Sequence, residues 1–192
     1  MNPATILSTL LFCSAGFYYC YLILTDPSIQ PAFTTWFIFF IAVSVSFSSY
    51  LLKRRTLKKW WVNIQNATDV FFVGLTLILI VWKNGWEIFP ISSYEKICVA
   101  LAGVIIFFWL MRRDHLRTNI MTQSLLIIGY YPTLEKLWLT GNHESYFLWA
   151  FYWLGSLVTL IPAIEDKDWL AVLYSTRAFI MISVVLIFMT IA

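Results

Sequence analysis

Two ionisable residues, Asp69 and Arg177, each stand within a long apolar run of the sequence. Each lies about nine residues from one end of its run, or roughly 13 Å along a helix, near the middle of a hydrocarbon core about 30 Å thick. A lone charge at that depth costs at least about 2.5–3.5 kcal/mol. We therefore expect the two side chains to be partnered. They would form an ion pair that fixes helix packing, a midplane site for a small polar or zwitterionic solute, or both.

Polar side chains accompany both charges. Gln65 and Asn66 precede Asp69 by four and three positions, and Tyr174 precedes Arg177 by three. Residues at these spacings lie on one face of a helix. We therefore predict that substrate-binding residues are Gln65, Asn66, Asp69, Tyr174 and Arg177. In this interpretation the Asp69 carboxyl is the candidate for proton coupling.

Two tryptophans, Trp36 and Trp149, stand near the start of two other apolar runs. Tryptophan at such a position is typical of an aromatic belt at the membrane surface. The functional alternative is that the pair stacks on a solute, and we include both among the candidate substrate-binding residues.

Gly129 and Pro132 lie inside one apolar run. A proline within a helix removes a hydrogen bond and kinks it. The segment is thus either a gating hinge, with Gly129 and Pro132 as its residues, or a static kink.

The composition explains why these charges are rare. The 192 residues are 60% hydrophobic and 12% charged, whereas a soluble domain is about half apolar and about a quarter charged. This excludes a disordered protein, a nucleic-acid binder and almost any soluble enzyme.

Seven apolar runs predict an all-α integral membrane protein with seven transmembrane helices. The runs are 4–24, 32–52, 60–82, 97–111, 119–138, 146–164 and 169–192.

Patterns typical of enzymes and metal sites are missing from the sequence. It has no Ser-His-Asp arrangement, Cys-x-x-Cys pair or glycine-rich phosphate loop. His115 and His143 are expected on opposite sides of the membrane, where they could not share a metal. We expect no enzyme activity, no metal and no cofactor.

Lysine and arginine are distributed unevenly between the two predicted faces. On the face of the N-terminus are Lys53, Arg54, Arg55, Lys58, Lys59, Arg112, Arg113, Arg117 and Lys167. On the other face are Lys83, Lys96 and Lys136. Basic residues concentrate on the cytoplasmic side. We therefore expect a cytoplasmic N-terminus and an outer C-terminus, in a bacterial inner membrane. We also expect the basic loop of residues 53–59 to be attracted to the acidic residues of 165–168.

The sequence also repeats itself. Two pairs of segments match at the same separation, and a third pair matches after a shorter loop; they are 16–18 with 129–131, 33–36 with 146–149, and 61–71 with 169–179. We predict a first triple-helix repeat over 1–92, a linker helix over 93–116 and a second triple-helix repeat over 117–192. Parallel repeats of this kind are related by an axis along the membrane normal. That axis would give Asp69 and Arg177 equivalent positions.

A three-plus-one-plus-three order of spans resembles the SWEET, PQ-loop and PnuC superfamily. The closest local similarity lies in 128–138 and 145–149, where Pro132-Thr133 takes the place of a Pro-Gln pair. In the first repeat Tyr19-Cys20 stands at the corresponding place. The resemblance implies two triple-helix bundles around a central pocket, with prolines in gating. Polar residues of the third and seventh spans and aromatic residues of the second and sixth would contact sugars, amino acids or vitamins.

The expected function is therefore a membrane transporter, either a facilitator or a proton-linked carrier, for a small polar solute. The alternative is a non-transporting membrane receptor or a structural subunit of a membrane complex with the same fold. Expected partners are the solute, the lipid bilayer and, in some arrangements, further copies of the chain or a larger complex.

Overall fold

The computed structural model describes residues 2–54, 61–84, 93–112, 114–141 and 144–191. All regular structure in these residues is helical, which confirms the all-α fold class. The helices are α1 (Pro3–Thr25), α2 (Phe33–Arg54), α3 (Ile64–Asn84), α4 (Ser93–Arg112), α5 (His115–Gly129), α6 (Tyr131–Thr140), α7 (Tyr146–Glu165) and α8 (Trp169–Ile191). Residues 55–60, Arg113 and His143, which entered the charge and histidine predictions, lie outside the described residues.

Local side chains set several helix ends. The Asn2 side chain accepts a hydrogen bond from the Ala4 N–H (3.0 Å) where α1 begins, and Ser145 Oγ accepts one from the Leu148 N–H (3.3 Å) where α7 begins. Both satisfy backbone donors that the first turn of a helix leaves unpaired. The chain leaves α6 at Gly141 with φ of 83°, a conformation that glycine adopts without steric cost.

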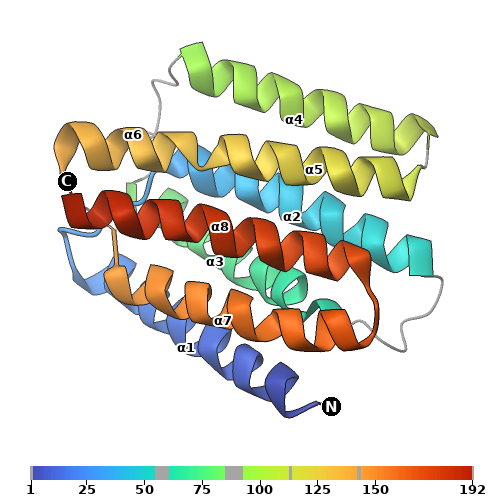
Figure 1. Cartoon of the computed structure of the whole chain (residues 1–192). Coiled ribbons are helices and arrows are strands. Elements are labelled where there is room, and N and C mark those ends of the chain that lie inside the picture. The colour runs from blue at the N-terminus through green and yellow to red at the C-terminus, as the bar shows by residue number, and fades with distance from the viewer. Residues whose placement is uncertain (1, 55–60, 85–92, 113, 142–143, 192) are drawn as a thin grey trace.

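The fifth apolar run was predicted as one kinked helix, but the structure divides it into α5 and α6, which follow one line in Figure 1. The break falls at Tyr130, whose N–H donates to the Ile127 carbonyl oxygen (3.2 Å). Pro132 lies in the first turn of α6. Its missing N–H leaves no helical hydrogen bond unmade there, so this proline begins a helix instead of interrupting one.

The outer surface of the bundle carries many large apolar side chains. Trp82 is 73% exposed and Trp169 is 79% exposed. Within the described residues, five segments are long and apolar enough to cross a membrane, namely Pro3–Thr25, Phe33–Leu52, Trp61–Asn84, Tyr146–Glu165 and Trp169–Ile191. In α4 the apolar stretch is shorter, Lys96–Met111. The apolar exterior is compatible with a multi-pass membrane protein.

The helices pack in a regular pattern. Helix α3 contacts both α1 and α2, while α8 contacts α7 and the α5–α6 pair. Across the middle of the bundle, α1 packs against α7 and α2 packs against α5, and α4 covers α5 and α2 at one edge (Figure 1). Helix α1 begins and α8 ends at opposite ends of the bundle (Figure 1).

The close contact between α1 and α7 provides a test of this packing. A Cβ atom added at Gly155 would lie 2.5 Å from Cε1 of Phe12, which is fully buried, whereas one added at Gly103 would meet nothing within 4 Å. We expect Gly155→Ala to lower the free energy of unfolding in detergent by about 1–3 kcal/mol through overpacking. Gly103→Ala is the matched control and should be neutral or slightly stabilising. Equal effects of the two substitutions would contradict the packing described here.

Candidate functional site

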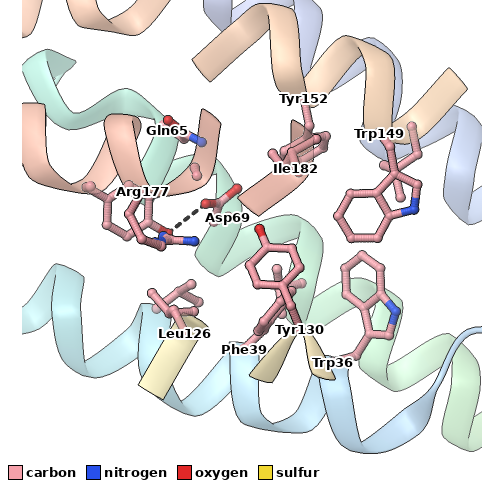
Figure 2. Close-up of a pocket in the computed structure, with 15 residues that line it drawn as sticks. Trp36, Phe39, Gln65, Asp69, Leu126, Tyr130, Trp149, Tyr152, Arg177 and Ile182 are labelled. Carbon is pink, nitrogen blue, oxygen red and sulfur yellow. Dashed lines mark hydrogen bonds between the residues drawn. The ribbon is translucent and has the colours of Figure 1, made fainter. Parts of the chain in front are cut away.

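A cavity lies in the middle of the bundle, where residues of α2, α3, α5, α7 and α8 and Tyr130 line it (Figure 2). Its volume is about 40 Å³. The lining residues that carry polar or aromatic groups are Trp36, Phe39, Gln65, Asp69, Tyr130, Trp149, Tyr152, Tyr174 and Arg177. The rest of the wall is aliphatic, so the polar groups stand in an apolar surrounding.

Asp69 and Arg177 are connected through Tyr174. The Tyr174 hydroxyl donates to Asp69 Oδ2 at 2.6 Å, and the Arg177 guanidinium carbon lies 4.7 Å from the centre of the Tyr174 ring. The side-chain contacts of these residues include no direct Asp69–Arg177 ion pair within 4.0 Å. The ion pair that was one alternative predicted from the sequence is therefore not formed, and the buried Tyr174 contacts both groups instead.

Each charged group keeps one atom without a hydrogen-bond partner from the protein. Asp69 is 8% exposed and Arg177 is 7% exposed, yet Asp69 Oδ1 and Arg177 Nη2 are both unpaired. The Arg177 Nε–H donates to Gln123 Oε1 (3.3 Å), which orients the guanidinium. Buried polar atoms are normally paired. The charged pair therefore contributes one free acceptor and one free donor to the cavity.

The two predicted polar neighbours of Asp69 point to different places. Gln65 lines the cavity, and its Nε2 donates to Ser156 Oγ at 2.7 Å. Asn66 is buried outside the cavity lining, and its Nδ2 donates to Ser46 Oγ at 3.0 Å. Ser46 also accepts from Asn119. Asn66 thus belongs to a polar contact between α2, α3 and α5.

Aromatic side chains form one end of the cavity. Trp36 and Trp149 are buried there, at the opposite end from Gln65 and Arg177 (Figure 2). The Tyr130 ring lies 6.0 Å from that of Trp149, measured between ring centres. Both tryptophans are inside the bundle, so they are cavity residues and do not belong to a surface belt.

Three of the polar and aromatic lining residues, Phe39, Tyr130 and Tyr152, were not predicted from the sequence. Phe39 and Tyr152 each follow a predicted tryptophan, Trp36 or Trp149, by three positions. Because residues at this spacing share a helix face, the pattern could have identified both. Tyr130 carries no such signal, since its place depends on the break between α5 and α6.

The predicted hinge residues lie behind the cavity wall. A Cβ atom added at Gly129 would lie 2.9 Å from Cε1 of Phe39, a lining residue. Pro132 is buried one turn further along, in α6. The structure therefore places both next to the wall and outside the lining, and their role in gating stays a prediction.

A second buried carboxyl, missed by the sequence analysis, lies beyond the aromatic end. The Tyr19 hydroxyl donates to Glu144 Oε2 at 2.7 Å, and both residues are buried. Burial raises the pKa of the Glu144 carboxyl from 4.5 to about 7. The Tyr19 hydrogen bond, the charge of Lys136 and the nearby Trp149 oppose that rise. Glu144 stands in the connection between α6 and α7, where no periodic pattern could signal its burial.

Comparison of the chain with protein-family models, curated proteins and solved structures gives no match.

The contacts of Arg177 generate the first prediction for the site. Arg177→Met should lower the free energy of unfolding in detergent by about 3–5 kcal/mol, because it leaves the Asp69 charge buried without a cation nearby. Adding Asp69→Asn should recover a large part of that loss. Chemical unfolding of the two single variants and the double variant measures their coupling. If Arg177→Met folds and inserts normally without the second change, the two charges are not partnered.

The burial of Glu144 should make the stability of the protein depend on pH. A raised folded-state pKa means that the fold favours the protonated carboxyl. The stability it contributes is complete below about pH 4.5 and is lost as the pH rises through about 7. Thermal unfolding should show a loss of up to about 3 kcal/mol over this range.

Glu144→Gln should reduce this pH dependence by the Glu144 contribution, because glutamine does not ionise. Glu135→Gln, which changes an exposed carboxyl on α6, is the matched control and should leave the dependence in place. A Glu144→Gln variant with the same pH dependence as the unchanged protein would contradict the assignment.

Proposed function

We propose that the chain is a membrane transporter, a facilitator or a proton-linked carrier, for a small polar solute that passes through the central cavity. The observation that carries the proposal is the pair of unpaired atoms, Asp69 Oδ1 and Arg177 Nη2, in one cavity whose wall is otherwise mostly aromatic and aliphatic. A solute with both a cationic and an anionic group satisfies the two together. A zwitterion is therefore the solute class that the cavity fits best.

The lining of the cavity supports the internal repeat. Three pairs of lining residues come from corresponding positions of the proposed repeats, and they are Trp36 with Trp149, Phe39 with Tyr152, and Asp69 with Arg177. A cavity on a pseudo-twofold axis would be lined in this way. The wall then presents similar aromatic groups from both halves and opposite charges from equivalent positions.

Helix packing supports the same architecture. In each proposed repeat the third helix contacts the other two, since α3 contacts α1 and α2 while α8 contacts α7 and the α5–α6 pair. The contacts between the halves, α1 with α7 and α2 with α5–α6, exchange under a twofold rotation. With α5 and α6 taken as one pass, the helices of the described residues make seven passes along the bundle. This supports the resemblance to the SWEET, PQ-loop and PnuC superfamily.

We place the N-terminus in the cytoplasm and the C-terminus outside a bacterial inner membrane, following the uneven lysine and arginine distribution. The opposite positions of the start of α1 and the end of α8 agree with an odd number of crossings (Figure 1).

The second candidate is a structural subunit or receptor of a membrane complex. The small volume of the cavity, about 40 Å³, favours it, because a static core needs no room for a solute. The many exposed aromatic side chains, such as Trp82 and Trp169, also suit a surface that packs against another membrane protein.

Uptake by proteoliposomes distinguishes the two candidates. The purified chain should transport at least one zwitterionic amino acid from a panel that also contains sugars and nucleosides. A pH gradient tests proton coupling. Asp69→Asn should reduce the uptake rate about tenfold or more, since a lost charge-assisted hydrogen bond is worth about 1.5–3 kcal/mol.

Two tryptophans provide the matched comparison. Trp149→Ala removes a cavity wall and should also reduce uptake, whereas Trp169→Ala alters an exposed surface and should leave it unchanged. No flux of any solute, together with no ligand-dependent rise in melting temperature, would contradict transport and favour the structural candidate.

A further inference from the structure

Another cavity lies where α2 and α4 end and α5 begins, and the described residues that line it are Leu52, Trp109, Leu110 and His115. These three helix ends are at the same end of the bundle (Figure 1). The volume of the cavity is about 320 Å³, within the range of about 300–1,000 Å³ that ligand pockets occupy. The three helices contact one another, so a packed part of the bundle bounds this cavity.

Two nitrogen atoms of the lining side chains have no hydrogen-bond partner among the residues that the structure describes. They are Trp109 Nε1 and His115 Nδ1, and both atoms are buried. Buried polar atoms are normally paired. An indole N–H only donates, and an imidazole nitrogen donates when it carries the proton. One group that satisfies both atoms must therefore accept from Trp109, and it accepts from His115 in the Nδ1–H form.

Basic residues stand at the helix ends around this cavity. Lys53 and Arg54 are the last two residues of α2, Arg112 is the last residue of α4, and Arg117 is in the first turn of α5. The acidic residue beside them, Asp114, accepts from the Arg117 N–H (3.1 Å) and pairs with Arg117 Nε (3.2 Å). These helix ends therefore carry more positive than negative charge, which favours an anionic acceptor.

Exposed apolar side chains lie beside the unpaired nitrogen atoms. Leu52 and Leu110 line the same cavity, and each is more than half exposed. A free anion would leave both leucines uncovered, whereas an amphipathic ligand covers them with its hydrocarbon part. Basic pockets between membrane helices are known to hold anionic lipid headgroups. The cavity thus combines the features that a lipid with a negative headgroup requires.

We propose that this cavity binds the phosphate headgroup of an anionic phospholipid, whose acyl chains lie along Leu52 and Leu110. A phosphate oxygen accepts hydrogen bonds from Trp109 Nε1–H and His115 Nδ1–H, and the basic helix ends attract its negative charge. The bound lipid holds the ends of α2 and α4 against the start of α5. The proposal concerns binding alone, so it does not depend on transport through the central cavity.

Titration of the purified chain with lipids tests this site. The chain in detergent is titrated with phosphatidylglycerol and, in parallel, with phosphatidylcholine, and native mass spectrometry measures the bound fraction. Phosphatidylglycerol should bind about tenfold more tightly, because phosphatidylcholine carries a cation that the basic helix ends repel. Equal affinity for the two lipids would overturn the proposal.

Two tryptophan variants test the assigned donor. Trp109→Phe keeps an aromatic ring and removes the N–H, so it should weaken phosphatidylglycerol binding about tenfold through the loss of a hydrogen bond to a charged group. Trp82→Phe changes an exposed tryptophan near the end of α3; it is the matched control and should leave the affinity unchanged. Equal effects of the two substitutions on the affinity would show that the donor is wrongly assigned and would overturn the proposal.

His115→Ala keeps the test decisive if Trp109→Phe fails to fold. Alanine favours helix, so the first turn of α5 should still form, and the affinity for phosphatidylglycerol should again fall about tenfold. Melting temperatures measured without lipid detect a purely structural role. A variant that lowers the melting temperature while it keeps the full preference for phosphatidylglycerol would overturn the proposal. Inorganic phosphate that binds as tightly as phosphatidylglycerol would assign the cavity to a free anion and would overturn the lipid.

Discussion

The burial of Asp69 and Arg177 is the constraint on which the arrangement of the bundle depends. A charge removed from water is tolerated only where other groups stabilise it, and here those groups come from different helices. Tyr174 of α8 donates to Asp69 of α3, while Gln123 of α5 accepts from Arg177 of α8. Helices α3, α5 and α8 must therefore converge at one level. That convergence joins the two halves of the chain through their interior.

The two ends of the cavity differ in the side-chain contacts around them: hydrogen bonds at one end and aromatic rings at the other. Near Gln65, side-chain hydrogen bonds link α3 to α7 through Ser156 and Thr159. Ser46 of α2 accepts hydrogen bonds from side chains of α3 and α5. At the other end the contacts are between rings, Trp36 with Tyr19 and Trp149 with Tyr130. A solute crossing the cavity would meet aromatic faces at one end and amide and guanidinium groups at the other.

The sequence predicted the helices well because their apolar runs are long, and it predicted part of the site because the helical period is regular. It placed Gln65 with Asp69 and Tyr174 with Arg177, and all four line the cavity. It could not separate Asn66 from Gln65, since neighbouring positions differ by about 100° around a helix and the surrounding helices decide which direction faces the cavity. The proposed repeat assigned equivalent positions to the charges without fixing the distance between them.

Features that depend on how the segments between helices pack could not be predicted from the sequence. Glu144 and Asp168 stand in short polar segments, where a carboxyl is ordinarily exposed, yet both are buried and accept hydrogen bonds from Tyr19 and Tyr50. The division of the fifth run into α5 and α6 likewise depends on where Tyr130 docks, against Phe39 and Trp149.

The proposed binding role depends on the unpaired atoms of the charged pair. A polar cluster that serves only stability gains from pairing every donor and acceptor, because each buried unpaired group costs about 1–3 kcal/mol. Around Ser46, amide donors from two helices meet one hydroxyl, and Asn66 Oδ1 stays unpaired there. Asp69 Oδ1 and Arg177 Nη2 differ in their place, because they belong to cavity-lining residues whose side chains are held by Tyr174 and Gln123. Groups that are oriented by the protein and left open toward a cavity are the arrangement that recognition of a ligand requires.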